Sequence, residues 1–543
     1  MAADHFSAQA GPRYGLSRRG WLASLAGLAL ALAFPPFEWR LLAWIALTPL
    51  LLAAAGRGAR EAVRLAALAG LVFWLVSIHW IRHVTVLGWL ALAAYCALYF
   101  IPPVWAWSVW TRRRGVRSGW ANLVGMCWFA LLWAGSEYLR GRLFTGFAWN
   151  PLAVSQYRQL ALCQHASWGG MYVLSALLAL ACAGWAALIL RWRAGGRARG
   201  QPELLVLLIT LAAAQRGGAR LLAAQPPAGG DVSIAVVQPN IPQVEKWSPA
   251  HFDLIYRTLE TWTRLAARLA PALIVWPETA VPDEVRVDPA SASLVRSLAA
   301  EGTPLLVGTV ESDGSGAGGV HYYNSSLLVL PDGALAAVYD KQHLVLFGEY
   351  MPGERWLPWL RRLAPIPESF SAGRDPVPMR LPGHDFTFCV LICFEDTVPW
   401  LARRAVRAGA QVLINQTNDA WFDPAAAAVQ HLSHGVFRSI ENRIPTVRAA
   451  NTGMSGGIDA AGRLHDLLTD AAGERRVAGF RVVPVRPRPP QAPLTLYSRW
   501  GDWFGFCAAL LGYLPLVAAW GRAMTTRRLH GLWRPGTFRS KRR

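Results

Sequence analysis

Hydrophobic and polar positions divide the chain into two kinds of sequence. Long apolar runs fill most of residues 20–222 and return at 502–521, whereas residues 223–500 alternate short apolar runs with polar turns. A transmembrane helix needs about 20 predominantly apolar residues. The long runs therefore predict eight transmembrane helices, at residues 20–36, 41–55, 65–81, 86–110, 119–138, 168–190, 203–222 and 502–521.

The arginines predict how these helices are oriented. Arginine clusters precede the first run and follow the second, fourth, sixth and eighth runs. With eight crossings all of these clusters fall on one side, which the positive-inside rule assigns to the cytoplasm. The expected division is a cytoplasmic tail (1–19), seven membrane helices (20–222), an extracytoplasmic domain (223–500), a last membrane helix (501–521) and a basic cytoplasmic tail (522–543).

A second interpretation of the N-terminus is an export signal. Ser17-Arg18-Arg19 matches the start of a twin-arginine signal, but its cleavage would remove the first helix and break the alternation of charge. We therefore expect an uncleaved first helix.

Composition excludes several classes of protein. Apolar residues make up 53% of the chain and charged residues 16%, against about 25% charged in an average soluble domain. The chain is therefore neither disordered nor purely soluble. Its net charge of +21 follows largely from the arginine clusters between the apolar runs, so we expect no nucleic-acid partner. Seven cysteines in 543 residues exclude a disulfide scaffold.

The extracytoplasmic domain alternates predicted strands and helices, which is typical of an α/β fold. Strands are predicted at 232–238, 272–276, 304–310, 323–330, 334–339, 385–394, 411–415 and from 447 onward. Helices are predicted at 250–269, 291–300, 399–408 and 425–441, and a flexible Gly/Ser loop at 312–319. Several strands are wholly apolar, which indicates sheets covered by helices.

Three polar residues directly follow apolar strands of this domain. Glu278, Lys341 and Cys393 come after LIVWP, AAVYD and FCVLI respectively, and ligands of α/β proteins bind at the carboxyl ends of strands. Glu278 can serve as the base that a cysteine nucleophile needs, and Lys341 can stabilise a thiolate or an oxyanion. A cysteine on an apolar strand is more often a packing residue, so these residues alone leave both interpretations open.

Five segments around these residues resemble the nitrilase, or carbon–nitrogen hydrolase, superfamily with its Glu-Lys-Cys triad. The segments are Trp276–Ala280, Tyr339–His343, Phe347–Pro352, Ile392–Glu395 and Asn418–Phe422. Apolar runs before such a domain, and one after it, resemble the bacterial apolipoprotein N-acyltransferase family over residues 20–521. The resemblance implies an extracytoplasmic αββα sandwich on a multi-span membrane domain in the bacterial cytoplasmic (inner) membrane.

The resemblance also implies the roles of individual residues. Glu278 corresponds to the general base, Lys341 to the cation that stabilises the oxyanion, Cys393 to the nucleophile, and Glu349 to a second glutamate that positions the lysine. Supporting or binding residues are expected at Trp247, Asn324, Tyr350, Phe394, Glu395, Asn418 and Trp421. No metal or other cofactor is implied.

The implied reaction has two steps. Cys393 takes an acyl chain from a membrane phospholipid as a thioester, and the α-amine of an S-diacylglyceryl-cysteine at a lipoprotein N-terminus then accepts it, with ping-pong kinetics. The expected partners are therefore the phospholipid donor, the diacylglyceryl-lipoprotein acceptor and the bilayer, with the enzyme acting as a monomer. The alternative is a membrane-tethered amidase or nitrilase with water as acceptor. A transporter would show inverted repeats or broken polar helices, and the sequence indicates neither.

Other polar features have competing interpretations. Residues 355–372 are either a mobile arm that dips into the membrane interface and admits lipid, or a packed loop. Glu137, Arg140 and Arg142, followed by residues 146–150, either serve a lipid headgroup or the outer domain, or are a snorkelling helix end.

Three further motifs are expected to be structural. Gly453–Gly457 matches the G-x-S-x-G pattern but precedes a hairpin rather than a helix, so a turn is favoured. His431 and His434 lack a metal-binding motif around them. Cys389 and Cys393 lie ~13 Å apart on one strand, beyond disulfide reach.

Overall fold

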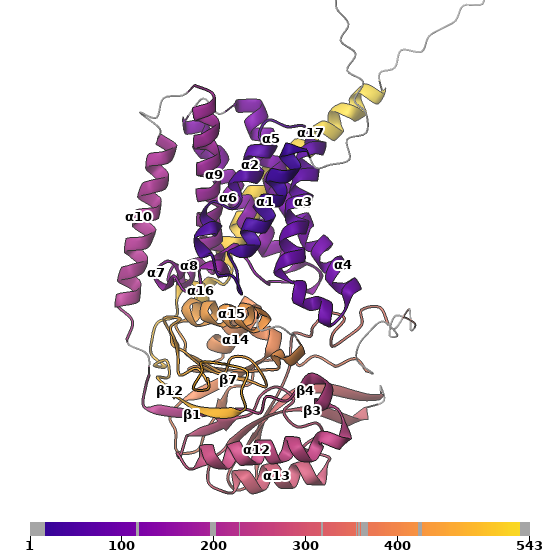
Figure 1. The fold of residues 1–543 in the computed structure, drawn as a ribbon, viewed down its shortest axis with the longest axis vertical. Helices are drawn as coiled ribbons and strands as arrows, with labels where there is room; N and C mark the ends of the chain where they lie inside the picture. Colours follow the sequence, from indigo (N-terminus) through magenta and orange to yellow (C-terminus); the bar gives the residue numbers. More distant parts are fainter. Residues whose placement is uncertain are drawn as a thin grey trace, which may run out of the picture.

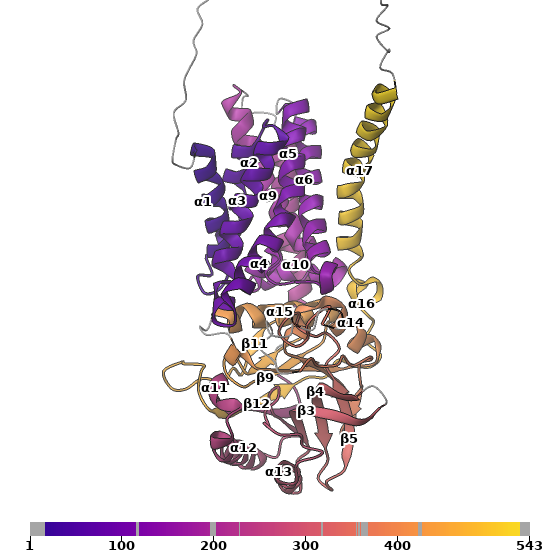
Figure 2. The ribbon, with the colours of Figure 1, turned by 90° about the vertical axis from the view of Figure 1, so that its right-hand side faces the viewer.

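The computed structural model describes residues 17–115, 119–195, 202–226, 229–316, 319–354, 356, 359, 368–421 and 426–532. A bundle of long helices stands on an α/β unit, and helix α15 (Ala426–Asn442) lies where the two meet (Figure 1). In the perpendicular view the bundle helices run roughly side by side, away from the α/β unit (Figure 2). The main helices of the bundle are α1 (Arg18–Leu32), α2 (Thr48–Ala54), α3 (Ala59–Ser77), α4 (Val86–Ala97), α5 (Ile101–Arg114), α6 (Gly119–Arg140), α9 (Tyr172–Arg193), α10 (Pro202–Ala223) and α17 (Trp503–Leu532).

Two of the predicted apolar runs are broken. The fourth run forms α4 and α5, joined by a 3-10 turn at Leu98–Phe100, because Pro102 and Pro103 lack the N–H groups that a continuous helix needs. The second run forms the 3-10 helix Arg40–Trp44 followed by the seven-residue α2.

Length and composition mark fewer membrane spans than the sequence pattern predicts. Within the described residues, three stretches are long and apolar enough to cross a membrane: Val86–Arg114, Tyr172–Arg193 and Pro202–Ala223. Arg40–Ala54 and Trp503–Ala518 are shorter apolar helices. The count of eight spans therefore stays a prediction.

Short helices connect the bundle elements where they approach the α/β unit. They are His79–His83, Leu143–Thr145, Leu152–Gln156, α7 (Leu160–Cys163) and α8 (Ala166–Gly169).

The α/β unit contains two six-stranded sheets, in the orders β12-β1-β2-β3-β4-β5 and β11-β10-β9-β8-β7-β6. The first sheet comprises β1 (Val232–Gln238), β2 (Leu273–Val275), β3 (Leu305–Gly316), β4 (Gly319–Val329), β5 (Leu335–Asp340) and β12 (Gly479–Val485). The second comprises β6 (Met379–Arg380), β7 (Thr387–Ile392), β8 (Val412–Thr417), β9 (Thr446–Ala450), β10 (Gly456–Ile458) and β11 (Leu464–His465). Parallel pairing runs through β1-β2-β3 and through β7-β8-β9.

The two sheets pack face to face between two layers of helices. Val236 and Leu306 of the first sheet share a buried core with Val390 and Ile414 of the second. Helices α12 (Phe252–Ala267) and α13 (Pro289–Ala299) cover the outer face of the first sheet. Helix α14 (Pro399–Arg407) packs on the second sheet, beside α15. The expected αββα sandwich is confirmed.

The flexible loop expected at 312–319 is wrong for residues 312–316 and 319, while residues 317 and 318 lie outside the described residues. Strand β3 continues to Gly316 and β4 begins at Gly319, and the two pair antiparallel, with Glu311 opposite Tyr323 and Asp313 opposite His321. The ladder supplies hydrogen bonds that outweigh the weak strand propensity of the Gly/Ser sequence.

Helix α15 joins the sandwich to the bundle. Leu432, Val436 and Phe437 belong to the same buried core as the bundle helices. The Oε1 of Gln430 accepts hydrogen bonds from the indoles of Trp80 and Trp149, at 3.1 and 2.8 Å. Its Nε2 donates to the carbonyls of Pro35 and Ser77, at 2.8 and 3.0 Å. The buried side-chain amide of Gln430 thus connects α15 of the α/β unit to several segments of the bundle.

Candidate active site

Glu278, Lys341 and Cys393 lie at strand ends, as the sequence predicts. Glu278 follows β2, Lys341 follows β5 and Cys393 directly follows β7, and all three side chains are buried. The chain turns sharply at two of these points, because Thr279 and Cys393 have φ angles of 42° and 51°. Non-glycine residues hold such angles only where the surrounding structure imposes them, often at functional sites.

A buried lysine joins two carboxylates. The Nζ of Lys341 lies 2.7 Å from Glu349 Oε1 and 3.3 Å from Glu278 Oε1. Asn324 Nδ2 donates to the same two oxygens, at 2.8 Å for Glu278 and 3.2 Å for Glu349. Burial lowers the pKa of Lys341, but the charges of Glu349, Glu278 and Cys393 outweigh it and raise this pKa above its usual value. The lysine is therefore a fixed ammonium.

The cysteine is a protonated thiol at rest. Burial raises the pKa of Cys393 well above its usual range, and the charge of Glu278 raises it further, whereas Lys341 and a hydrogen bond with Thr417 lower it. A thiol of this kind needs a base to become a nucleophile. Glu278 Oε2 is buried and has no hydrogen-bond partner among the described residues, so it has a free lone pair with which to accept a proton.

Glu395 connects the loop after Cys393 to the loop after Lys341. Its Oε2 accepts from the amide of Ile392 and the hydroxyl of Tyr339, at 2.7 and 2.8 Å. Its Oε1 accepts from the amides of Gln342 and His343, at 2.7 and 3.0 Å. This single buried carboxylate therefore fixes the loop after Cys393 relative to the loop after Lys341.

A buried ionic network contacts the backbone of Cys393 through His431. His431 Nε2 lies 3.1 Å from the Cys393 carbonyl oxygen and 2.8 Å from Asp396 Oδ1, and its Nδ1 lies 2.9 Å from Asp419 Oδ1. Arg448 contacts both aspartates, at 2.8 and 3.1 Å. Burial lowers the pKa of His431, but Asp396 and Asp419 outweigh burial and the repulsion of Arg448, and raise this pKa to about 9.

Comparison with known proteins gives a consistent family. The chain matches a model of the apolipoprotein N-acyltransferase N-terminal domain over residues 26–184 and a carbon–nitrogen hydrolase model over residues 233–492. It is 39% identical to the apolipoprotein N-acyltransferase of Geobacter metallireducens over 83% of this chain and 87% of that one. The chain belongs to the apolipoprotein N-acyltransferase family. The enzyme of the same name from Gloeobacter violaceus is 34% identical, over 92% of this chain and 94% of that one.

Among solved structures, a crystal structure of an amidase from Nesterenkonia is similar with 21% identity and a TM-score of 0.34, over 50% of this chain and 96% of that one.

The remaining predicted site residues fall into two groups. Asn418 is buried and bonds to Gln243 and Asn451, at 2.8 and 3.0 Å, so it holds the loop that follows β1. Trp247, Tyr350 and Trp421 keep part of their side chains exposed. Among the described residues, none of these three side chains forms a hydrogen bond with Glu278, Lys341 or Cys393.

The sequence analysis missed one buried lysine of this site. Lys246, which ends the short helix α11 (Gln243–Lys246), donates to the Glu278 carbonyl at 3.0 Å and to Thr279 Oγ1 at 2.7 Å. Burial lowers its pKa to about 8, although Glu278 and Cys393 oppose the shift. It holds the strained turn that presents Glu278. The sequence feature that could have identified Lys246 is its position directly before Trp247, which was already predicted to belong to the site.

Phe394 and the bundle loop at 146–150 form a common aromatic stack. Phe394 lies parallel to Trp149 and to Phe147, with ring centroids 6.1 and 6.3 Å apart. The loop itself is fixed by Arg140, whose Nη1 donates to the carbonyls of Phe147 and Trp149, both at 2.7 Å. The sequence left open whether this polar segment supports the outer domain. The stacking of Phe147 and Trp149 on Phe394 favours that interpretation.

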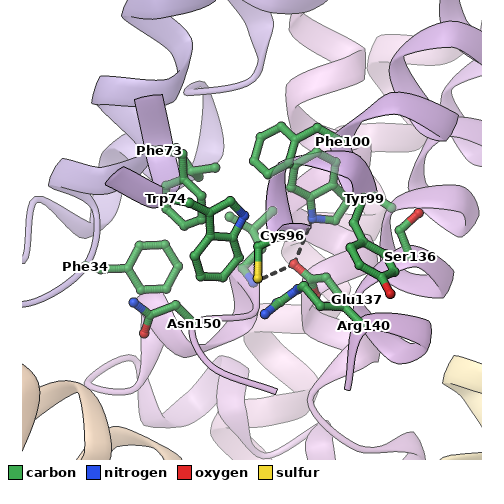
Figure 3. Close-up of a pocket in the computed structure, with 13 residues that line it drawn as sticks. Phe34, Phe73, Trp74, Cys96, Tyr99, Phe100, Ser136, Glu137, Arg140 and Asn150 are labelled. Carbon is green, nitrogen blue, oxygen red and sulfur yellow. Dashed lines mark hydrogen bonds between the residues drawn. The ribbon is translucent and has the colours of Figure 1, made fainter. Parts of the chain in front are cut away.

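Glu137 and Arg140 also line a small cavity inside the bundle (Figure 3). Glu137 Oε1 accepts from the indole of Trp133 and the amide of Leu152, at 2.9 and 2.7 Å. The cavity, of about 20 Å³, has room for about one water molecule. These buried polar groups are therefore structural rather than a snorkelling helix end.

The G-x-S-x-G segment is a turn, as expected. It connects β9 to β10, and Ser455 Oγ donates to Gln238 Oε1 at 2.6 Å.

Proposed function

We propose that this protein transfers an acyl chain from a membrane phospholipid to the α-amine of an S-diacylglyceryl-cysteine at a lipoprotein N-terminus. One observation carries the proposal. The chain combines the Glu278–Lys341 ion pair and the buried Cys393 with a helix bundle that matches the N-terminal domain of the same family. Both proposed substrates are anchored in a bilayer, and a membrane-embedded bundle would hold the site next to that bilayer.

The first half-reaction forms a thioester. Glu278 Oε2 accepts the proton of the Cys393 thiol, and the sulfur attacks the carbonyl carbon of the phospholipid ester. The negative charge that develops on the carbonyl oxygen faces the Lys341 ammonium, and donors of this kind are each worth about 10²–10³ in rate. When the tetrahedral intermediate collapses, the ester C–O bond breaks and lysophospholipid leaves with the proton from Glu278.

The second half-reaction transfers the acyl chain. The lipoprotein α-amine attacks the thioester carbonyl, Glu278 takes a proton from the amine nitrogen, and the C–S bond breaks. The amide product forms, and the proton passes from Glu278 to the Cys393 sulfur. One base therefore serves both steps. Because lysophospholipid leaves the thioester enzyme before the lipoprotein amine reacts, the kinetics are ping-pong. Each chain contains the whole constellation, so the proposed active form is a monomer.

We propose that the α/β unit lies on the extracytoplasmic side of the bacterial cytoplasmic membrane, with both termini and the basic tails in the cytoplasm. The alternation of arginine clusters supports this orientation. The outward faces of the bundle carry exposed apolar side chains, as a lipid-facing surface requires. Examples are Leu25, Leu28, Leu205, Leu208, Ile209, Leu510 and Leu514.

The arm that the sequence places at 355–372 falls mostly outside the described residues. Two of its described side chains, Trp356 and Trp359, are 84% and 57% exposed, and Phe347 on the preceding loop is also exposed. We propose that these aromatic rings contact the membrane interface, where tryptophan is favoured. Equal proteolysis of this segment with and without liposomes would refute this part of the proposal.

The experiment that tests the function follows the fate of a labelled acyl chain. The purified enzyme in phospholipid vesicles carrying a labelled acyl donor is mixed with a diacylglyceryl-lipopeptide that has a free α-amine. We expect label on the lipopeptide. The competing function, a membrane-tethered hydrolase, predicts labelled free fatty acid, and an N-acetylated lipopeptide is the matched control acceptor.

A further inference from the structure

A second polar cleft lies where the bundle meets the sandwich, at the base of α17. It is lined by the end of α6, by α14, by the short helix α16 (Leu496–Trp500) and by the first turn of α17. Figure 2 shows α14 and α16 beside the lower end of α17. The cleft has a volume of about 290 Å³, close to the lower end of small-molecule sites at ~300 Å³.

Two arginines from different elements reach this cleft. Arg142 follows α6 and pairs with Asp502, with Nη2 2.5 Å from Oδ2. Arg403 of α14 donates through Nε to the Ser498 carbonyl at 3.0 Å and through Nη2 to the Arg499 carbonyl at 2.7 Å. Both guanidinium groups are therefore held in place before any ligand arrives.

The charge around the cleft is unbalanced. Burial lowers the pKa of Arg403, and the nearby positive charges of Arg407 and Arg142 lower it further, while Tyr497 and Asp502 oppose them. One carboxylate thus faces several guanidinium groups. An anion between Arg142 and Arg403 would relieve this repulsion, and paired arginines suit the planar, bidentate recognition of phosphate.

The rest of the cleft is aromatic and continues into an apolar surface. Trp400, Trp500 and Trp503 line it, and Trp500 is 71% exposed. Phe506 also lines it, and beyond it four exposed side chains in the described part of α17 are apolar: Leu510, Leu511, Leu514 and Val517. Tryptophans at the end of a lipid-facing helix are typical of the membrane–water interface.

We propose that this cleft binds the headgroup of a membrane phospholipid, with its phosphate diester between Arg142 and Arg403 and its acyl chains along the exposed face of α17. The site goes beyond the proposed acyl transfer and is separate from the Glu278, Lys341 and Cys393 cluster. A ring contact nevertheless connects the two, because Trp400 packs edge-on against His343, with centroids 6.3 Å apart, two residues after Lys341. A lipid in the cleft therefore touches a residue that touches the catalytic loop.

Photocrosslinking in nanodiscs tests the proposal. The full-length Cys393→Ala protein, which cannot consume the donor, is illuminated with phosphatidylethanolamine that carries a diazirine on its headgroup, and crosslinked peptides are mapped by mass spectrometry. We expect crosslinks in the peptides that contain Trp400 and Trp500. The Arg142→Gln/Arg403→Gln variant should lose at least tenfold of this signal, because both charge-assisted contacts to the phosphate are gone.

Two further variants keep the test independent of folding. Arg142→Gln/Asp502→Asn removes the ion pair without leaving a buried lone carboxylate, and it should still lose several-fold of the signal. Arg264→Gln removes an exposed arginine of α12, which lies at the opposite end of the α/β unit (Figure 1), and should change nothing. Thermal unfolding checks that each variant is folded.

Competition identifies the source of the phosphate. Unlabelled phospholipid should abolish the crosslinks, whereas millimolar inorganic phosphate or soluble glycerophosphoethanolamine should leave most of them. Equal competition by inorganic phosphate would make the cleft a free-anion site and overturn the proposal. Undiminished crosslinking in the folded Arg142→Gln/Arg403→Gln variant would overturn it as well. Failure here leaves the acyl-transfer proposal standing, because thioester formation is measured separately at Cys393.

Discussion

Glu349 offers a sharp test of how the site holds its cation. In the structure Lys341 has two carboxylate partners, and the Glu349 contact, at 2.7 Å, is shorter than the Glu278 contact at 3.3 Å. Glu349→Gln keeps the shape and removes the charge. The Lys341 ammonium should then move onto Glu278, the carboxylate that accepts the thiol proton in the proposed mechanism, and occupy it.

The size of this effect follows from the contact that is lost. A hydrogen bond to a charged group contributes about 1.5–3 kcal/mol, and each 1.36 kcal/mol is a factor of ten. The single-turnover rate of Cys393 acylation should therefore fall roughly 10–150-fold. The assay is intact-mass spectrometry of enzyme mixed with phospholipid, sampled over time and over pH. The pH dependence of acylation should also change, because Lys341 then pairs with Glu278 alone, whereas a merely looser fold would leave that dependence unchanged.

The matched control is Glu354→Gln, in the same loop. Glu354 accepts a hydrogen bond from Ser369 at 2.9 Å and makes no described contact with Lys341. Its acylation rate should stay close to that of the unmodified enzyme. An acylation rate within twofold of the unmodified enzyme in Glu349→Gln, or an equal loss in Glu354→Gln, would refute this account of the lysine.

Two more predictions concern stability. Because the pKa of His431 is raised to about 9 from ~6.5, its contribution to folding is complete below pH ~6.5 and is lost as pH rises through 9. Thermal unfolding between pH 6 and 10 should show a decline on the order of 3 kcal/mol, and the decline should flatten in His431→Gln; an unchanged slope would contradict the ionic network. Gln430→Ala removes four buried hydrogen bonds between α15 and the bundle, and should destabilise the protein by about 3 kcal/mol. Differential scanning of that variant should show a lower melting temperature, whereas Gln225→Ala, which loses only a local helix-end bond, should melt as the unmodified protein does.

The sequence predicted the parts of the fold that depend on local pattern. The short apolar run at 232–238 predicted β1 with its observed bounds. The apolar strands before Glu278, Lys341 and Cys393 predicted that these residues lie at strand ends, and the structure has Glu278 and Lys341 after strands of the first sheet and Cys393 after a strand of the second. The antiparallel pairing of β3 with β4 at Ser312, Asp313 and Gly316 was missed, since its stability comes from the partner strand rather than from the local Gly/Ser composition.

The features that sequence could not predict depend on contacts between distant elements. The network beneath Cys393 combines Asp396, Asp419, His431 and Arg448, and no local spacing relates them. Lys246 contacts the site only because its loop packs against the strained turn at Thr279, a contact that no local sequence pattern indicates. The break between α4 and α5 was readable from Pro102 and Pro103, but the apolar run around them concealed it.

The central claim is that Cys393 becomes acylated by a phospholipid. Intact-mass spectrometry of the enzyme after mixing with phospholipid vesicles measures this directly. The account predicts one added acyl group, mapped to Cys393, removed by hydroxylamine and by a lipopeptide amine, and missing in Cys393→Ala. An acyl adduct that persists in Cys393→Ala, or lipopeptide acylation by that variant at the full rate, would contradict it.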